Sequence, residues 1–122
     1  MAMNLLGLGL SGAKHHEDAL SVKEAELSMR RRLGASESSM LDVQSNLAIS
    51  YHVLGRFEEA LSVRREVYSA SLKIRGEEHD NTLLAANNYA ATLNDVKRFE
   101  ETRTLLRKVM RVARRVLGES HE

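Results

Sequence analysis

Apolar residues recur at the spacing of helices along most of this chain. One stripe lies between Ser39 and Gly55 and consists of Leu47, Ala48, Tyr51 and Leu54. A second stripe ends before Gly76 and consists of Phe57, Ala60, Val63, Val67 and Ile74. Such spacings place all members of a stripe on one face of an α-helix. Ser39 followed by Asp42 is typical of a capped helix start, and glycine is typical of a helix end. The sequence therefore predicts two amphipathic helices joined at Gly55.

The same pattern returns after 42 residues. The word RFEE occurs twice, and its arginines, Arg56 and Arg98, are 98 − 56 = 42 positions apart. Other residues keep this register: Asn4, Asn46 and Asn88; Glu17, Glu59 and Glu101; Gly34, Gly76 and Gly118; and the pair His79 and His121. Periods of about 20 to 50 residues are the signature of solenoids, whose units bury their apolar faces against one another. We expect one domain over residues 1–122, with units at about 1–34, 35–76 and 77–118 and a further connector beginning at 118–122.

The units differ in regularity. In the third, a second helix is expected from Phe99 to Gly118. In the first, a short helix beginning at Asn4 contains three glycines, each of which costs about 0.8 to 1 kcal/mol relative to alanine. Its partner helix is expected at about residues 17–33 and is one residue short relative to the other copies. Nothing resembles a strand, so we predict an all-α chain of six helices in three antiparallel pairs.

The composition agrees with packed helices and adds expectations about location. Proline and cysteine are absent, and aromatic residues make up only 4% of the chain. Without cysteine there is no disulfide and no Cys-ligated zinc, which fits a reducing compartment, so we expect a cytoplasmic protein. The apolar N-terminus lacks the basic segment of a signal peptide and is shorter than the roughly 20 residues that span a bilayer. No association with a membrane is expected.

The run LAISYHVLGRFEEA resembles the helix pair of tetratricopeptide repeats, with Leu47, Ala48, Tyr51, Gly55, Phe57 and Ala60 at the characteristic places. The 42-residue period, the asparagine before the large-small pair and connectors such as GEEHDNTL are similar to the repeats of kinesin light chains and their relatives. This resemblance implies a right-handed α-solenoid whose first helices line a concave groove. The chain departs from the pattern at Lys23 and Arg64, where an apolar or aromatic residue is common, and at Thr102 and Asp80.

The resemblance implies that the groove binds an extended segment of another protein. A helical wheel centred on Leu47 places several residues of the second unit away from the core stripe. From these and their equivalents in the third unit we take eight groove residues: Asn46, Ile49, Val53, Asn87, Asn88, Ala91, Asn94 and Asp95. An amide side chain offers a donor and an acceptor to a peptide backbone. The alternative is that Asn46 and Asn88 form hydrogen bonds between neighbouring helices.

The end of the last predicted helix offers two further surfaces. A basic stripe of Arg103, Arg107, Arg111 and Arg114 could bind an anionic partner, RNA or an anionic membrane. No aromatic residues interleave for base stacking, so a solvated face is the simpler interpretation and no nucleic acid is expected. Apolar residues at this end, Leu105, Met110 and Val116, are expected to lack a covering neighbour, which would permit a homo-oligomer.

Machinery for catalysis is not recognisable in the sequence. The adjacent His15 and His16 would diverge by about 100° on a helix and so chelate one ion poorly, which favours a solvated turn over a metal site. His79 and His121 belong to connectors, where capping or packing roles are expected. We therefore expect no enzyme, no metal and no cofactor, but a protein-interaction module. The alternatives are a self-associating segment of a longer array with an unused groove, and a basic adaptor for anionic partners.

Overall fold

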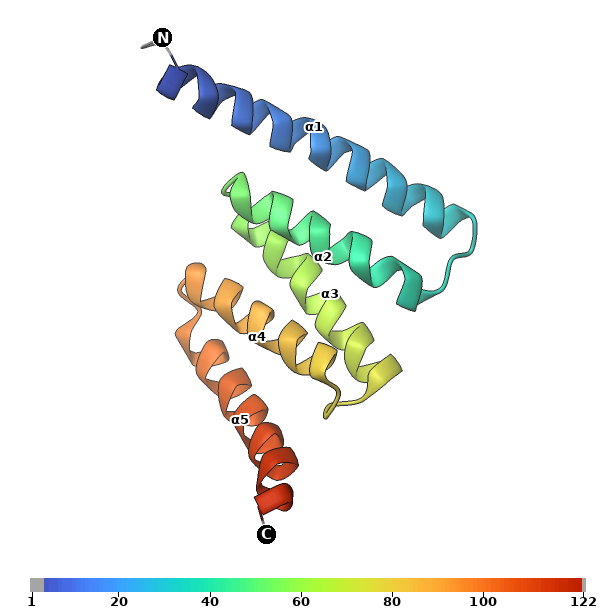
Figure 1. Ribbon diagram of the computed structural model, residues 1–122, viewed down its shortest axis with the longest axis vertical. Helices are drawn as coiled ribbons and strands as arrows, with labels where there is room; N and C mark the ends of the chain where they lie inside the picture. The colour runs from blue at the N-terminus through green and yellow to red at the C-terminus, as the bar shows by residue number, and fades with distance from the viewer. Residues whose placement is uncertain (1–3, 122) are drawn as a thin grey trace.

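The computed structural model describes the backbone of residues 4–121 and the side chains of residues 14–118. This part of the chain contains five α-helices and no strand: α1 (Asn4–Arg32), α2 (Glu37–Val53), α3 (Phe57–Arg75), α4 (Asp80–Asp95) and α5 (Phe99–His121). Close backbone contacts join each helix only to its neighbours in the sequence. Figure 1 shows the result, a row of helices with α1 at one end and α5 at the other. The predicted all-α repeat fold is confirmed.

The first unit differs from the predicted helix pair, because α1 continues without a break from Asn4 to Arg32. The prediction of six helices is therefore wrong. The later units turn between their helices at Gly55, with φ 77°, and at Lys97, with φ 65°. The equivalent position of the first unit, 55 − 42 = 13, is Ala13, and alanine has the highest helix propensity of all residues. The helix accordingly passes through this position.

The ends of the helices are close to those expected, with two corrections. The N-cap of α2 is Ser36, whose hydroxyl accepts a hydrogen bond from the Ser39 amide at 3.2 Å, so the helix begins earlier than the predicted start at Ser39. Gly118 does not end α5, which continues to His121. His79 has the capping role expected for a connector histidine, because its Nδ1 accepts a bond from the Asn81 amide at 3.0 Å. The side chain of His121 lies outside the described residues.

The repeated word RFEE forms the same local structure twice. Its phenylalanines, Phe57 and Phe99, are the first residues of α3 and α5, as expected. The preceding Arg56 donates two hydrogen bonds to the carboxylate of Glu59, both at 2.6 Å. In the next unit Arg98 Nε donates to Glu101 at 2.8 Å. The word therefore recurs because each second helix begins with the same guanidinium–carboxylate pair.

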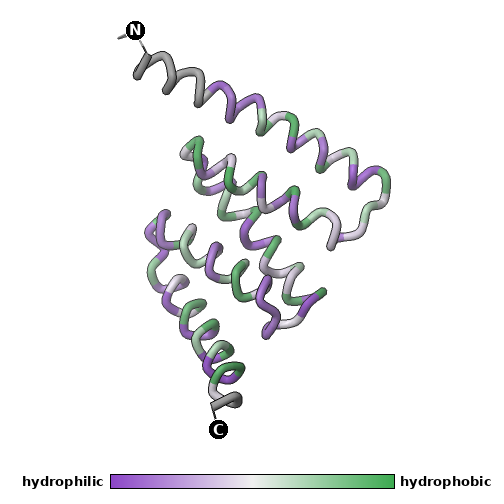
Figure 2. Tube along the Cα trace, in the orientation of Figure 1, coloured by the Kyte–Doolittle hydropathy of each residue, from purple (hydrophilic) through white to green (hydrophobic). Residues whose placement is uncertain are grey.

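The core is aliphatic and runs from helix to helix. Its first cluster joins α1, α2 and the start of α3, and consists of Leu20, Leu27, Val43, Leu47, Tyr51 and Ala60. A second cluster joins α3, α4 and α5, and consists of Leu61, Ala86, Ala90, Leu93 and Leu105. Figure 2 shows apolar and polar residues interspersed along the coloured part of every helix. Within the described residues, no helix combines the length and hydropathy needed to cross a membrane.

Candidate functional site

The candidate site is a hollow of about 420 Å³ between α2 and α4, which we call the α2–α4 groove. Its lining residues are Leu41, Asp42, Ser45 and Ile49 of α2; Arg64, Val67, Ser71 and Arg75 of α3; and Asn81, Leu84, Ala85 and Asn88 of α4. The backbones of α2 and α4 make no close contact with each other, whereas α3 packs on both. The groove therefore lies over α3, flanked by one helix from each of two successive units.

The groove contains only some of the residues chosen from the sequence. All eight lie outside the core, as the helical wheel predicted, but only Ile49 and Asn88 line the hollow. Asn46, Val53, Asn87, Ala91, Asn94 and Asp95 are exposed on neighbouring positions of the same two helices. Asp95 does connect the helices, because its Oδ2 lies 3.6 Å from Nδ1 of His52 near their C-terminal ends.

The two asparagines of the repeat register have different surroundings. Lys23 of α1 donates to the backbone oxygen of Asn46 at 3.5 Å and to the Ser50 hydroxyl at 2.9 Å, so Asn46 lies on the side of α2 that approaches α1. Asn88 is half-buried within the groove. Among the described residues neither amide side chain forms a hydrogen bond. The interhelical bonds of the structural alternative are thus not present there, and both amides are available to a ligand.

Arg64 is one of the groove residues that were not predicted from the sequence. Its side chain is half-buried, and burial lowers the pKa of its guanidinium from the usual value. Within the described part of the chain it forms neither a hydrogen bond nor an ion pair. The sequence did contain a signal, because a basic residue stands at a place where the family resemblance expects an apolar or aromatic one.

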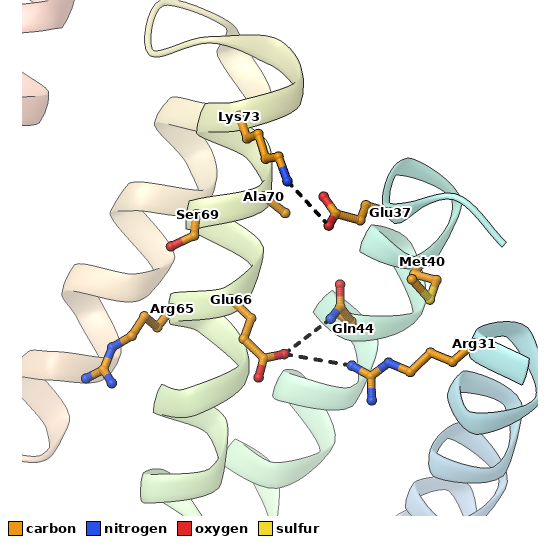
Figure 3. A pocket seen from close by; sticks show the side chains of 9 residues that line it. All are labelled: Arg31, Glu37, Met40, Gln44, Arg65, Glu66, Ser69, Ala70 and Lys73. Atoms are coloured by element: carbon orange, nitrogen blue, oxygen red, sulfur yellow. Dashed lines mark hydrogen bonds and ion pairs between the residues drawn. The ribbon is translucent and has the colours of Figure 1, made fainter. Parts of the chain in front are cut away.

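A second hollow, of about 480 Å³, lies on α1, α2 and α3 and is drawn in Figure 3. Its charged groups are engaged with one another. Glu66 accepts a bond from Gln44 at 3.4 Å and lies 4.0 Å from Arg31, while Lys73 lies 3.9 Å from Glu37. Arg65 points away from these residues in the figure and donates to the hydroxyl of Tyr89 at 3.0 Å. This hollow therefore offers fewer free polar groups than the α2–α4 groove.

The outer side of α5 is partly apolar. Met110 is 52% exposed, as predicted, and Leu117 is 62% exposed. Leu105 was expected to be exposed as well, but it is buried in the cluster between α4 and α5, and Val116 is half-buried. The helical wheel identified the apolar residues of α5 but did not show which of them α4 covers.

The basic stripe of α5 is only partly neutralised. Arg103 pairs with Glu100 at 2.8 Å, and Arg115 pairs with Glu77 and Glu78. The ion pairs of the described residues do not include Arg107, Arg111 or Arg114. These three guanidinium groups are exposed to solvent.

The two adjacent histidines lie within α1, so the predicted turn at residues 15–18 is wrong. Their ring centroids are 6.0 Å apart at an angle of 69°. The described residues contain no group of three or more His, Cys, Asp or Glu side chains placed to hold a metal ion.

Comparisons with known proteins agree with the repeat architecture. Residues 39–93 and residues 82–122 each match a family model described as Tetratricopeptide repeat. The crystal structure of BtubC (BKLC) from P. vanneervenii is similar to this chain, with a TM-score of 0.69 and 22% sequence identity. The match covers 86% of this chain and 42% of that one, so the chain spans less than half the length of this structural relative. A comparison with curated proteins gives no match.

Proposed function

Because the chain belongs to the tetratricopeptide repeat family, whose repeats are generally protein-interaction modules, we propose that it binds an extended segment of another protein in the α2–α4 groove. This family is the one that the sequence was found to resemble. The proposed module is non-catalytic. Its units are the helix pairs α2–α3 and α4–α5, preceded by a first unit reduced to α1.

The observation that supports this proposal is the set of uncommitted side chains in the groove. Ile49 is 49% exposed and Leu84 is 57% exposed, on opposite sides of the hollow. Asn88 lies one helical turn from Leu84 on α4 with its amide free, and Asn46 lies about one helical turn from Ile49 on α2. An extended segment carries a backbone donor and acceptor at each residue, which amide side chains can satisfy, while its apolar side chains contact Ile49 and Leu84.

The test is a double substitution, Asn46→Ala with Asn88→Ala. Partners are first identified with an array of short peptides, and affinities are then measured by isothermal titration calorimetry. Each lost hydrogen bond contributes about 0.5 to 1.5 kcal/mol, so the affinity of the double variant for the peptide should be lower by a factor of about ten or more. The matched control is Asn87→Ala, which removes an exposed amide that lies beside Asn88 but outside the repeat register shared by Asn46 and Asn88. Unchanged binding by a folded double variant would refute the groove proposal.

Association through α5 is a second candidate, favoured by the exposed Met110 and Leu117. Two chains that cover these residues would form a homo-oligomer or extend an array. Sedimentation over a range of concentrations tests this, and Met110→Gln with Leu117→Gln should shift the distribution toward monomer. A wild-type protein that stays monomeric at high concentration would rule this candidate out.

Binding of anionic partners is a third candidate, favoured by the unpaired Arg107, Arg111 and Arg114. Its affinity for a polyanion such as heparin should fall steeply as salt increases, because each phosphate-like contact releases counterions. Weak binding without salt dependence would argue against this role.

A further inference from the structure

We infer that this chain forms a dimer in which residues 4–13 of each copy pack on α1 of the other copy. The inference concerns the outer face of α1, the side turned away from α2. No residue of α1 lines the α2–α4 groove, so the inference does not depend on the proposed function. It adds an interaction surface and names the partner, a second copy of the same chain.

The outer face of α1 lacks the cover that the later units have. The sequence ALSV at residues 19–22 returns at residues 60–63, so Val22 of α1 corresponds to Val63 of α3 with an offset of 63 − 22 = 41. Val63 is half-buried against the first core cluster, to which α2 contributes, and α2 is the first helix of the same unit. In the third unit this position is Leu105, since 63 + 42 = 105, and it is 8% exposed beside residues of α4. Val22, in contrast, is 67% exposed.

Residues 4–13 carry the apolar spacing of the first helix that is missing from this face. With the same offset of 41, four of them stand at the places of the core stripe of α2: Leu6, Gly7, Leu10 and Ala13 at those of Leu47, Ala48, Tyr51 and Leu54. The order of large and small residues at the first three places is therefore kept. In the second unit this stripe packs on the start of α3. The sequence spacing thus assigns residues 4–13 to a face such as that of Val22.

Within one chain this segment does not reach Val22. The helix α1 is continuous from Asn4 to Arg32, and it passes through Ala13 and Lys14, which correspond to the turns of the later units. Leu6 and Val22 are 22 − 6 = 16 residues apart, which is about 24 Å along a helix. A second copy that runs antiparallel brings its residues 4–13 to this face instead. Exchange of an identical element is a low-cost route to a dimer, because the contacts are those the fold already uses.

The exchange is closed at two copies and has complementary charges at its centre. When Leu6 lies opposite Val22 of the other copy, the two-fold axis passes near residue 14, the midpoint of 6 and 22. Lys14 and Asp18 are exposed one helical turn apart, and the ion pairs of the described residues include neither of them. Across the axis each lysine can reach Asp18 of the other copy. The pairing therefore joins opposite charges beside the apolar contact.

The first experiment is disulfide cross-linking, which is simple here because the chain contains no cysteine. The variant Leu6→Cys with Val22→Cys is equilibrated with oxidised and reduced glutathione and analysed on a non-reducing denaturing gel. A disulfide requires Cα atoms within about 7 Å of each other. Exchange should therefore convert most chains into a covalent dimer.

The matched control for cross-linking is Leu6→Cys with Met29→Cys. Met29 is 57% exposed on the same side of α1 but lies about two turns beyond Val22, out of reach of residues 4–13, so this variant should remain uncross-linked. A disulfide within one chain would show that residues 4–13 fold back as a closed hairpin. The absence of any disulfide would show that they stay unpaired, and either result would overturn the inference.

The second experiment measures mass by sedimentation equilibrium over a range of concentrations. The wild-type mass should reach a plateau near 2 × 13.7 = 27.4 kDa. Val22→Gln should raise the dissociation constant of the dimer about a hundredfold or more, because the contact occurs twice and each buried valine contributes roughly a factor of ten. Val22 is exposed in the single chain, so the variant should keep the melting temperature of α2 to α5, and the cross-linking result holds even if it does not.

The control in this experiment is Met29→Gln, which should leave the dissociation constant unchanged. Equal weakening by Val22→Gln and Met29→Gln would indicate pairing along the whole face of α1 rather than exchange. A dimer weakened only by Met110→Gln with Leu117→Gln would assign the association to α5. A wild-type chain that stays monomeric at high concentration would exclude the dimer, and each of these three results would refute the inference while leaving the groove function untouched.

Discussion

Replacing Tyr51 with phenylalanine should weaken the attachment of α1 to the rest of the protein. The backbone of α1 packs only on α2, so few contacts hold this helix. The Tyr51 ring is 8% exposed within the first core cluster, and its hydroxyl donates to Glu24 of α1 at 2.6 Å. Phenylalanine keeps the ring and removes this bond. A hydrogen bond to a charged group contributes about 1.5 to 3 kcal/mol, but the exposed Glu24 can bind water once the hydroxyl is gone. We therefore expect the free energy of unfolding to fall by about 1 to 1.5 kcal/mol at neutral pH.

The same contact predicts how stability depends on pH. Burial, with the hydrogen bond to Glu24 as the second cause, raises the pKa of Tyr51 to about 12 from its ordinary value of 10.0. Between these values the unfolded chain loses a proton that the folded chain keeps, so the free energy of unfolding falls as pH rises. A shift of two units corresponds to about 2.7 kcal/mol at most. The contribution is fully present below about pH 10 and is lost by about pH 12.

Urea unfolding followed by circular dichroism, from about pH 7 to about pH 12, tests both parts. The stability difference between wild type and Tyr51→Phe should favour wild type at neutral pH and shrink or reverse above about pH 10. The control is Tyr89→Phe, which removes a hydroxyl bonded only to the exposed Arg65 and should cost less than about 1 kcal/mol. Parallel pH curves for wild type and Tyr51→Phe, or equal losses for the two variants at neutral pH, would refute the reasoning.

Four further substitutions test the packing and the turns by the same unfolding measurement. Leu61→Ala should lower the free energy of unfolding by about 2 to 5 kcal/mol, because Leu61 is 2% exposed in the cluster between α3, α4 and α5. A decrease of less than about 1 kcal/mol would contradict that packing. Lys97→Gly should stabilise the protein by about 0.5 to 1 kcal/mol because Lys97 has a positive φ. Gly55→Ala at the equivalent turn should destabilise it for the same reason, although there is open space where the added Cβ would lie. Changes of the same sign in the two variants would be inconsistent with this account. Thr82→Val should cost about 1 kcal/mol, since the buried hydroxyl donates to the Ser71 backbone oxygen of α3 at 3.2 Å, and a neutral result would mean that this bond contributes nothing.

Local features of the sequence were sufficient for the helices of the second and third units. Helix periodicity depends only on which residues of one segment are apolar, and turns depend on residues such as Gly55 and Gly76 that adopt positive φ. The 42-residue register then established that these segments form a repeat. The start of α2 was misplaced because two serines compete as caps, and the end of α5 because Gly118 remains helical.

The first unit shows the limit of register alone. Asn4 and Glu17 keep the repeat spacing, but the position equivalent to Gly55 is Ala13, and α1 continues through it despite the glycines nearby. A shared register therefore does not by itself enforce a helix break. The expected helix pair was thus replaced by α1.

What the sequence determined by itself is the all-α repeat and the position of the eight chosen groove residues outside the core, because both follow from spacing within single helices. Which of those side chains meet across the groove was decided only by the stacking of three helices. Asn46 and Ile49 are both off the core stripe of α2, yet Ile49 lines the groove and Asn46 does not. Likewise, the half-burial of Arg64 and its lack of a partner depend on where α2 and α4 lie relative to α3, and spacing along one helix carries no information about that.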